Sequence, residues 1–283
     1  MSSINKIAVI GAGTMGSGIA HVFSQYGFSV ILVDSEQAFV ERGMSSINNN
    51  MDRQIKKGLI TPEQKNEFLI NIIPIIGHKN IDKNIDLTIE AISENKLAKL
   101  SLLKELNDLL NTNCIIASNT SSISITELGK NIRSDRFIGM HFMNPVPVMQ
   151  LVELIRGYST SDETFNAIYE LTIKIGKNPV EVYDYPGFIS NRILMPMINE
   201  AIFALYEGVA KAEDIDTVMK LGMSHPMGPL TLADFIGLDV CLAIMEVLYE
   251  GFNDSKYRPC PLLKKMVNAG KLGRKTKKGF FEY

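Results

Sequence analysis

The feature that most constrains this chain is a glycine-rich turn near its start, between a short apolar run and a helical pattern. Residues 7–10 are all apolar, as in a parallel strand that is buried on both faces. Gly11, Gly13 and Gly16 follow, and they open a segment whose apolar residues recur on one helical face. A second apolar run occupies residues 28–33. This order predicts a strand–helix–strand unit within a parallel sheet.

The spacing of the three glycines, with a strand before and a helix after, is typical of a dinucleotide-binding loop. The first glycine permits a tight turn, the second lets the backbone approach a pyrophosphate, and the third lets helix and strand pack closely. The helix N-terminus presents amide N–H groups to phosphates. Asp34 ends the second strand, where a carboxylate accepts ribose hydroxyls and repels a 2′-phosphate. The next three residues include no arginine, so NAD is favoured over NADP. The alternative is a tight turn that binds no ligand.

The remaining pattern predicts an α/β chain of two domains. Residues 38–70 are polar and helical around a turn at Gly58 and Thr61-Pro62, which predicts a helical hairpin that projects from the sheet. Further strands are expected at 85–92, 114–117, 137–142, 151–155 and 180–183. Helices alone are expected after Tyr185, at 189–206, 212–221, 230–248 and 261–269. We therefore expect a Rossmann-type doubly wound sheet over 1–185, which binds NAD, and an all-α domain over 186–283 for substrate binding and dimerisation.

A histidine and a glutamate are candidates for proton transfer. His141 lies at the end of an apolar strand, where parallel sheets form their ligand crevice. Glu153 lies inside the apolar stretch 151–155, and a carboxylate there is costly without a partner. Glu153 lies twelve positions after His141, and the segment between them, which contains two prolines, is long enough to place the two side chains on adjacent strands. The pair would fix the tautomer of the imidazole. The alternative is a structural histidine beside a solvent-facing glutamate.

Weaker candidates lie elsewhere. The hydroxyl-rich run at 118–122, which includes Ser121, either binds a substrate oxygen or caps the next helix. Asn191 opens the long apolar helix after Gly187 and needs a partner, which is either substrate or protein. Lys56 and Lys57 are either ligand contacts or part of a solvated face.

Composition excludes several functions. The net charge of −2 gives no basic field for nucleic acid or an anionic membrane. No apolar run reaches the roughly 18–20 residues of a membrane span. The three cysteines, Cys114, Cys241 and Cys260, are far apart, which fits a reducing cytoplasm and argues against a zinc site or a disulfide framework.

With these motifs, the chain resembles the L-3-hydroxyacyl-CoA dehydrogenases, in particular the short bacterial form that acts on 3-hydroxybutyryl-CoA. The resemblance covers essentially the whole chain. The segments that carry it are VIGAGTMGSGIA, EAISENKLAK, ASNTSSISIT, GMHFMNPVPVMQLVELI, PGFISNRILMPMINEA, HPMGPLTLADFIGLD and GRKTKKGFFEY. It implies NAD-dependent interconversion of (S)-3-hydroxybutyryl-CoA and acetoacetyl-CoA, in butyrate and short-chain fatty acid metabolism. An acyl-CoA substrate is the expected small-molecule partner. The apolar faces of the C-terminal helices lead us to expect a homodimer through that domain.

The resemblance also implies roles for single residues. His141 is implied as general base and acid, with Glu153, Ser121 and Asn191 in the catalytic set. Implied NAD contacts are Gly11, Ala12, Gly13, Thr14, Met15, Gly16, Asp34, Glu94, Lys99, Ser121, Asn144 and Lys275. Implied substrate contacts are Asn50 and Lys57 (or Lys56), Ser121 and Asn191. No metal is implied.

Two rival functions remain. One is another Rossmann dehydrogenase, of the 3-hydroxyisobutyrate or phosphogluconate type, which uses a catalytic lysine in the helix after the sheet. The segment PGFISNRILMPMINEA contains no lysine, which counts against it. The other is an NAD-binding relative that has lost its chemistry.

Overall fold

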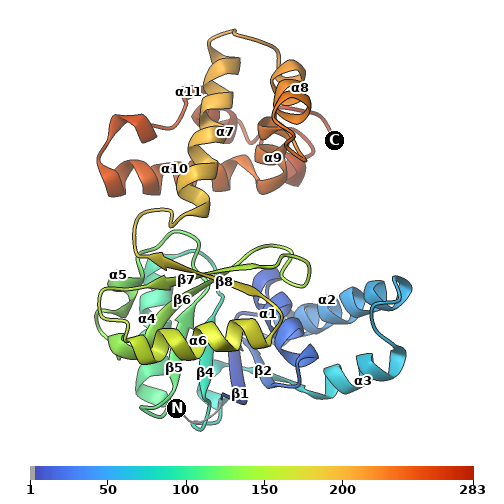
Figure 1. Ribbon diagram of the computed structural model, residues 1–283, viewed down its shortest axis with the longest axis vertical. Coiled ribbons are helices and arrows are strands. Elements are labelled where there is room, and N and C mark those ends of the chain that lie inside the picture. Colours follow the sequence, from blue (N-terminus) through green and yellow to red (C-terminus); the bar gives the residue numbers. More distant parts are fainter. Residues whose placement is uncertain (1–3) are drawn as a thin grey trace. The chain divides into compact units, whose positions relative to one another are not determined.

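The computed structural model describes residues 4–283 and divides the chain into two units, Met1–Asp184 and Tyr185–Tyr283. An eight-stranded sheet forms the first unit (Figure 1). Its strands are β1 (Lys6–Ile10), β2 (Ser29–Asp34), β3 (Ile72–Ile76), β4 (Leu87–Glu90), β5 (Ile115–Ser118), β6 (Phe137–Phe142), β7 (Leu151–Arg156) and β8 (Asn178–Tyr183). The spatial order β3-β2-β1-β4-β5-β6-β7-β8 reverses direction at β1. The expected doubly wound α/β sheet is confirmed.

The last two strands differ from the rest in direction. β1 to β6 are mutually parallel, whereas β7 pairs antiparallel with β6 and parallel with β8. The connection from β6 to β7 is residues 143–150, which is too short for the crossover of a dozen or more residues that a parallel return requires. β8 follows β7 through a full helix, α6 (Asp162–Lys174), and so returns parallel.

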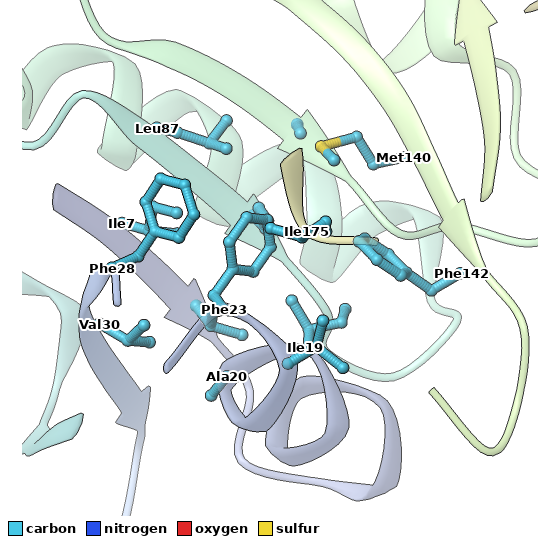
Figure 2. Close-up of a cluster of buried hydrophobic side chains, with 14 of the residues drawn as sticks. Ile7, Ile19, Ala20, Phe23, Phe28, Val30, Leu87, Met140, Phe142 and Ile175 are labelled. Carbon is cyan, nitrogen blue, oxygen red and sulfur yellow. The ribbon is translucent and has the colours of Figure 1, made fainter. Parts of the chain in front are cut away.

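Helices cover both faces of this sheet, and alternate residues of β1 face each way. Ile7 and Val9 belong to one buried cluster, with α1 (Thr14–Gln25), α2 (Gln37–Lys56) and α6, whereas Ala8 and Ile10 pack with α4 (Lys96–Leu109). Figure 2 shows the first cluster around Phe23 of α1. Each large apolar side chain buried there contributes about 1.5–3 kcal/mol. The glycine loop is thus attached to a strand that is packed on both sides.

The expected helical hairpin is confirmed as α2 and α3 (Pro62–Ile70), which extend away from the sheet (Figure 1). Thr61 caps α3: its hydroxyl accepts the Gln64 N–H at 3.2 Å, and the Gln64 side-chain oxygen accepts the Thr61 N–H at 2.9 Å. Pro62 occupies the first helical position, where no amide hydrogen is needed.

One strand was not predicted from the sequence. Strand β3 was missed because Pro74 interrupts its apolar run, yet a proline is tolerated here because β3 is the edge strand. The cap of α6 is Ser161, which accepts the Thr164 N–H at 3.1 Å, while the Thr160 hydroxyl donates to the carbonyl of Phe137.

Helices form the second unit around one apolar core, to which all of them except α8 contribute buried residues, and α8 packs Ala212 and Ile215 against it. They are α7 (Ser190–Tyr206), α8 (Ala212–Gly222), α9 (Pro229–Ile236), α10 (Leu238–Phe252) and α11 (Pro261–Asn268). The single helix expected at 230–248 is two helices, because Gly237 between them has φ +105°, and a Cβ there would lie 2.6 Å from Cε of Lys275. Within residues 4–283, no helix has the length and apolarity to cross a bilayer.

Candidate active site

The glycine loop between β1 and α1 has the geometry that its spacing predicts. Gly11 has φ +107°, and a Cβ there would lie 2.6 Å from the carbonyl oxygen of Ala91. A Cβ at Gly16 would lie 1.7 Å from the carbonyl oxygen of Gly11, so α1 approaches the loop too closely for any side chain. A Cβ at Gly13 would meet nothing within 4 Å. The protein therefore requires two of these glycines for its own packing, whereas the third leaves open space in front of the helix N-terminus.

A cavity of about 710 Å³ lies in front of this loop. Its lining includes Gly11, Ala12, Gly13, Thr14 and Asp34, whereas Met15 and Gly16 are outside it. Its size lies within the range of small-molecule sites. The open space at Gly13 and the amide groups at the start of α1 suit a pyrophosphate.

Asp34 is fixed at the rim of the cavity by backbone amides. Its Oδ2 accepts the Ala12 N–H at 2.7 Å, and its Oδ1 accepts the Ser35 N–H at 2.7 Å. The carboxylate is therefore oriented by the loop itself, with lone pairs left for the two hydroxyl groups of a ribose.

The same cavity is lined by residues that the sequence reasoning missed. Phe39, Arg42 and Ser46 lie at helical spacing on one face of α2, and His78 contributes from the short helical turn after β3. Positions three and seven residues apart share a helix face, but helical spacing alone does not show that this face of α2 lies against the glycine loop. The sequence-based expectation therefore covered only the three residues after Asp34.

His141 and Glu153 face each other across β6 and β7, as expected. They are register partners in the antiparallel pair, and Nδ1 of His141 lies 2.8 Å from Oε2 of Glu153. Both are buried, with 6% and 2% of their surface exposed. Met140, Phe142, Val152 and Leu154 all belong to the cluster around α1, so the period of two directs the pair to the opposite face of the sheet.

A second buried acid, Glu90 at the end of β4, was not singled out from the sequence. Its Oε1 lies 2.6 Å from Nζ of Lys99, and the two residues are 0% and 1% exposed. Its Oε2 accepts the Ser118 hydroxyl at 2.5 Å. Like Glu153, Glu90 is an acid inside an apolar strand that needs a partner, so the sequence contained the same signal for this pair.

The Glu90–Lys99 pair is continued by Glu94. Nζ of Lys99 lies 3.3 Å from Oε2 of Glu94. Oε1 of Glu94 accepts the hydroxyl of Thr120 at 2.5 Å and the N–H of Ser121 at 2.8 Å. The structure thus gives Lys99 a buried position in which its charge holds two carboxylates, and Glu94 fixes the loop that carries Ser121.

Two asparagines lie near the ends of β5 and β6. The buried Asn119 accepts the Phe142 N–H at 2.9 Å, which ties the 118–122 run to the residue after His141. Asn144 is exposed two residues beyond β6. Buried Lys177 donates from Nζ to the carbonyls of Val146 and Met149, each at 2.7 Å, and so holds the connection on which Asn144 lies. Burial lowers the pKa of Lys177.

The remaining predicted residues lie in other parts of the chain. Asn50 is part-buried, and its Oδ1 accepts a hydrogen bond from Arg53; Lys56 and Lys57 are exposed at the end of α2. Asn191 and Lys275 belong to the second unit. Asn191 is buried in the first turn of α7, and Nζ of Lys275 lies 2.7 Å from Oδ1 of Asp239.

The cysteines do not supply a nucleophile. Burial raises the pKa of Cys114 to about 11 and that of Cys241 to about 12, so both remain thiols near neutral pH. Burial also raises the pKa of Cys260.

Comparisons with known proteins place this geometry in a family. Residues 6–185 match the family described as "3-hydroxyacyl-CoA dehydrogenase, NAD binding domain", and residues 187–283 match "3-hydroxyacyl-CoA dehydrogenase, C-terminal domain". The chain belongs to the 3-hydroxyacyl-CoA dehydrogenase family. It is therefore an oxidoreductase, and its cofactor is NAD. The family resemblance drawn from the sequence is confirmed.

Individual relatives match over nearly their full length. A probable 3-hydroxybutyryl-CoA dehydrogenase of Deinococcus radiodurans is 54% identical over 98% of this chain and 100% of its own length. A 3-hydroxybutyryl-CoA dehydrogenase of Bradyrhizobium diazoefficiens is 54% identical over 99% of this chain and 96% of its own. The crystal structure of (S)-3-hydroxybutyryl-CoA dehydrogenase from Ralstonia eutropha has a TM-score of 0.96 and 51% identity, and covers 99% of both chains. A dehydrogenase of the 3-hydroxyisobutyrate or phosphogluconate type is thereby excluded.

Proposed function

We propose that this enzyme interconverts (S)-3-hydroxybutyryl-CoA and acetoacetyl-CoA with NAD(H). The observation that carries the proposal is the buried contact of 2.8 Å between His141 and Glu153 in a chain that has an NAD-binding domain. The names of relatives at 54% identity support the four-carbon acyl group. Nothing in the proposed chemistry needs a metal, since proton transfer is assigned to the imidazole.

His141 is the proposed general base and acid. Because ionised Glu153 only accepts hydrogen bonds, Nδ1 of His141 donates to it and Nε2 carries the lone pair. In oxidation Nε2 takes the proton of the C3 hydroxyl while the hydrogen on C3 leaves as hydride, and the C3–O bond becomes a carbonyl. NAD, when bound, accepts that hydride. In reduction the imidazolium returns the proton to oxygen, and Glu153 stabilises its charge throughout.

Other residues are proposed to bind and orient. Ser121, on a loop fixed by Glu94, and Asn191 are proposed to hydrogen-bond substrate oxygens. The glycine loop, Asp34, Asn144 and Lys275 are proposed NAD contacts. Glu94 and Lys99 are proposed to act on the NAD site indirectly, by fixing the backbone of residues 120–122. The buried hydrogen bond of Lys99 to Glu90 and the hydrogen bond from Thr120 to Glu94 support this role.

Substrate CoA is proposed to bind at the hairpin, where Asn50, Lys56 and Lys57 lie close together in sequence at the end of α2. The two lysines are exposed, and neither forms an ion pair with another residue of the described chain. Reversing their charge (Lys56→Glu with Lys57→Glu) should raise KM for acetoacetyl-CoA. KM for acetoacetyl-pantetheine, a truncated substrate, should stay unchanged because this compound lacks the nucleotide phosphates. An equal rise for both substrates would contradict the assignment.

The direct test of the proposed reaction is loss of NADH absorbance with acetoacetyl-CoA. Turnover, together with lower kcat/KM for longer 3-ketoacyl-CoAs, would support the proposal. NADH binding without turnover of any 3-ketoacyl-CoA would instead identify a silent relative, and efficient turnover of long chains alone would overturn the four-carbon assignment.

We also propose that the protein is a cytoplasmic homodimer formed through its second unit. Large apolar side chains of that unit are exposed, among them Ile193, Val209, Val218, Leu221 and Met223. Such surface is costly in water and is typical of subunit interfaces.

The proposed cytoplasmic location is supported by the three cysteines, which are free thiols and therefore suit a reducing compartment.

A further inference from the structure

The cofactor cavity contains a cation on α2, at the same end as Asp34. A Cβ at Gly43 would lie 2.7 Å from the carbonyl oxygen of Ala12, so α2 packs directly on the glycine loop. The N–H of Ala12 in turn donates to Asp34 at 2.7 Å. Arg42, which precedes Gly43, is therefore held on the rim that Asp34 occupies, and both residues line the cavity.

The side chain of Arg42 is oriented but not neutralised. Its guanidinium carbon lies 4.7 Å from the centre of the Phe39 ring, which supports one face of the planar group. Its charge is not paired with a carboxylate of residues 4–283. Ser35 and Ser46 line the cavity as well and bring hydroxyl donors. A planar guanidinium beside hydroxyl groups is well suited to bind a phosphate.

We propose that Arg42 is a second coenzyme-specificity residue, which binds the 2′-phosphate of NADP(H) and makes it a weaker alternative coenzyme. Asp34 favours NAD(H) because its carboxylate accepts ribose hydroxyls and repels a phosphate on the same ribose. Arg42, which lines the same cavity, attracts that phosphate. The preference for NAD(H) is then set by Asp34 acting against Arg42, rather than by the lack of a cation. This inference rests on the proposed contact of Asp34 with the ribose of NAD.

The test measures coenzyme binding without acyl-CoA, from the fluorescence of NADH and NADPH titrated with protein. Loss of charge-assisted hydrogen bonds in Arg42→Ala should raise Kd for NADPH by about tenfold or more, with Kd for NADH changed by less than about twofold. Asp34→Ser keeps a hydroxyl acceptor for Ala12 and should tighten NADPH binding. The double variant, Asp34→Ser with Arg42→Ala, should not bind NADPH more tightly in this way. Lys104→Ala removes one charge from an exposed position of α4 outside the cavity lining and serves as the control.

Three results would overturn the inference. Equal weakening of NADH and NADPH by Arg42→Ala would show that the arginine contacts a part common to both. Unchanged NADPH affinity in Arg42→Ala, or a double variant that binds NADPH as tightly as Asp34→Ser, would show that it does not bind the phosphate. In these cases NADH still binds, and the proposed function stands. Failure of the wild-type chain to bind NADH would overturn the proposed function as well.

Discussion

Glu153 and Glu90 are carboxylates buried inside an apolar sheet, and each is stable there because a basic side chain lies against it. Glu153 contacts His141 at 2.8 Å, and Glu90 contacts Lys99 at 2.6 Å. Removing one partner of such a pair leaves a buried charge uncompensated, which typically costs about 3–5 kcal/mol. The two pairs differ in their use. The first contains a group able to exchange a proton with substrate, and the second holds a loop in place through Glu94.

His21 on α1 is a buried titratable group with no part in the proposed reaction. It is fully buried, Nε2 lies 3.2 Å from Oε1 of Gln54 on α2, and Nδ1 has no hydrogen-bond partner within the described chain. Burial, opposed by the hydrogen bond to Gln54 and aided by the charge of Lys177, lowers the pKa of His21 to about 4. The folded state therefore favours the neutral imidazole.

This histidine should make the protein sensitive to acid. In the unfolded chain, His21 binds a proton once the pH falls below its ordinary pKa of 6.5. In the folded chain, it binds one only near its lowered pKa of about 4. The free energy of unfolding should thus fall by about 3 kcal/mol as the pH drops from 6.5 to 4. In His21→Gln, whose amide can still bond Gln54, urea unfolding across this range should show a decrease smaller by that amount. An identical decrease in both proteins would contradict the assignment.

At the scale of secondary-structure elements, the short connection between β6 and β7 determines the site. Because residues 143–150 cannot form a crossover, the two strands pair antiparallel, and His141 becomes the register partner of Glu153. Asn144 lies in this connection, which is held by Lys177, the residue before β8. The placement of the pair and of Asn144 therefore depends on one turn and one buried lysine.

Lys177→Met should loosen that turn. Methionine preserves the apolar stem but leaves the carbonyls of Val146 and Met149 without a donor, which should lower the free energy of unfolding by about 2–3 kcal/mol. Lys177→Arg should retain part of the stability because it still donates. Denaturant midpoints of both variants and of Lys104→Met, at an exposed lysine, provide the measurement. A midpoint for Lys177→Met equal to that of wild type would show that these two hydrogen bonds contribute nothing.

Elements with a strong local pattern were predictable from the sequence. The glycine loop, the hairpin at Thr61-Pro62 and strand 137–142 follow from turn chemistry and apolar runs, and the structure places them as expected. The antiparallel direction of β7 was missed because it depends on the length of the connection from β6. The break at Gly237 was missed because apolar residues continue on both sides of it. Arg42 was missed because its role depends on tertiary packing of α2 on the loop rather than on its neighbours in sequence.

At the scale of the whole molecule, the second unit presents apolar surface that its own core does not use. Val218 and Leu221 lie three residues apart on α8 and are 59% and 80% exposed. Residues at this spacing share one helix face, so the pair forms a continuous apolar strip. The proposed homodimer would remove this strip from water.

Charge on that strip should therefore separate the subunits. Wild type should have about twice the mass of the 31.5 kDa chain in light scattering at micromolar concentration, and Leu221→Glu combined with Val218→Asp should have the mass of one chain. Lys220→Glu, at a position between them, adds negative charge but leaves both apolar side chains in place. It therefore tests whether charge alone separates the subunits. A monomeric wild type would contradict the proposal, and so would a dimeric double variant.

The central claim is that His141, supported by Glu153, exchanges the proton of the substrate hydroxyl. The most direct measurement compares single-turnover NADH oxidation by wild type, His141→Ala and Glu153→Gln with saturating acetoacetyl-CoA. Loss of general acid–base catalysis should slow His141→Ala by about 10²–10⁴-fold, with Kd for NADH unchanged. Glu153→Gln should also be slow, since a neutral amide no longer stabilises the imidazolium. Turnover of His141→Ala at close to the wild-type rate would contradict the account.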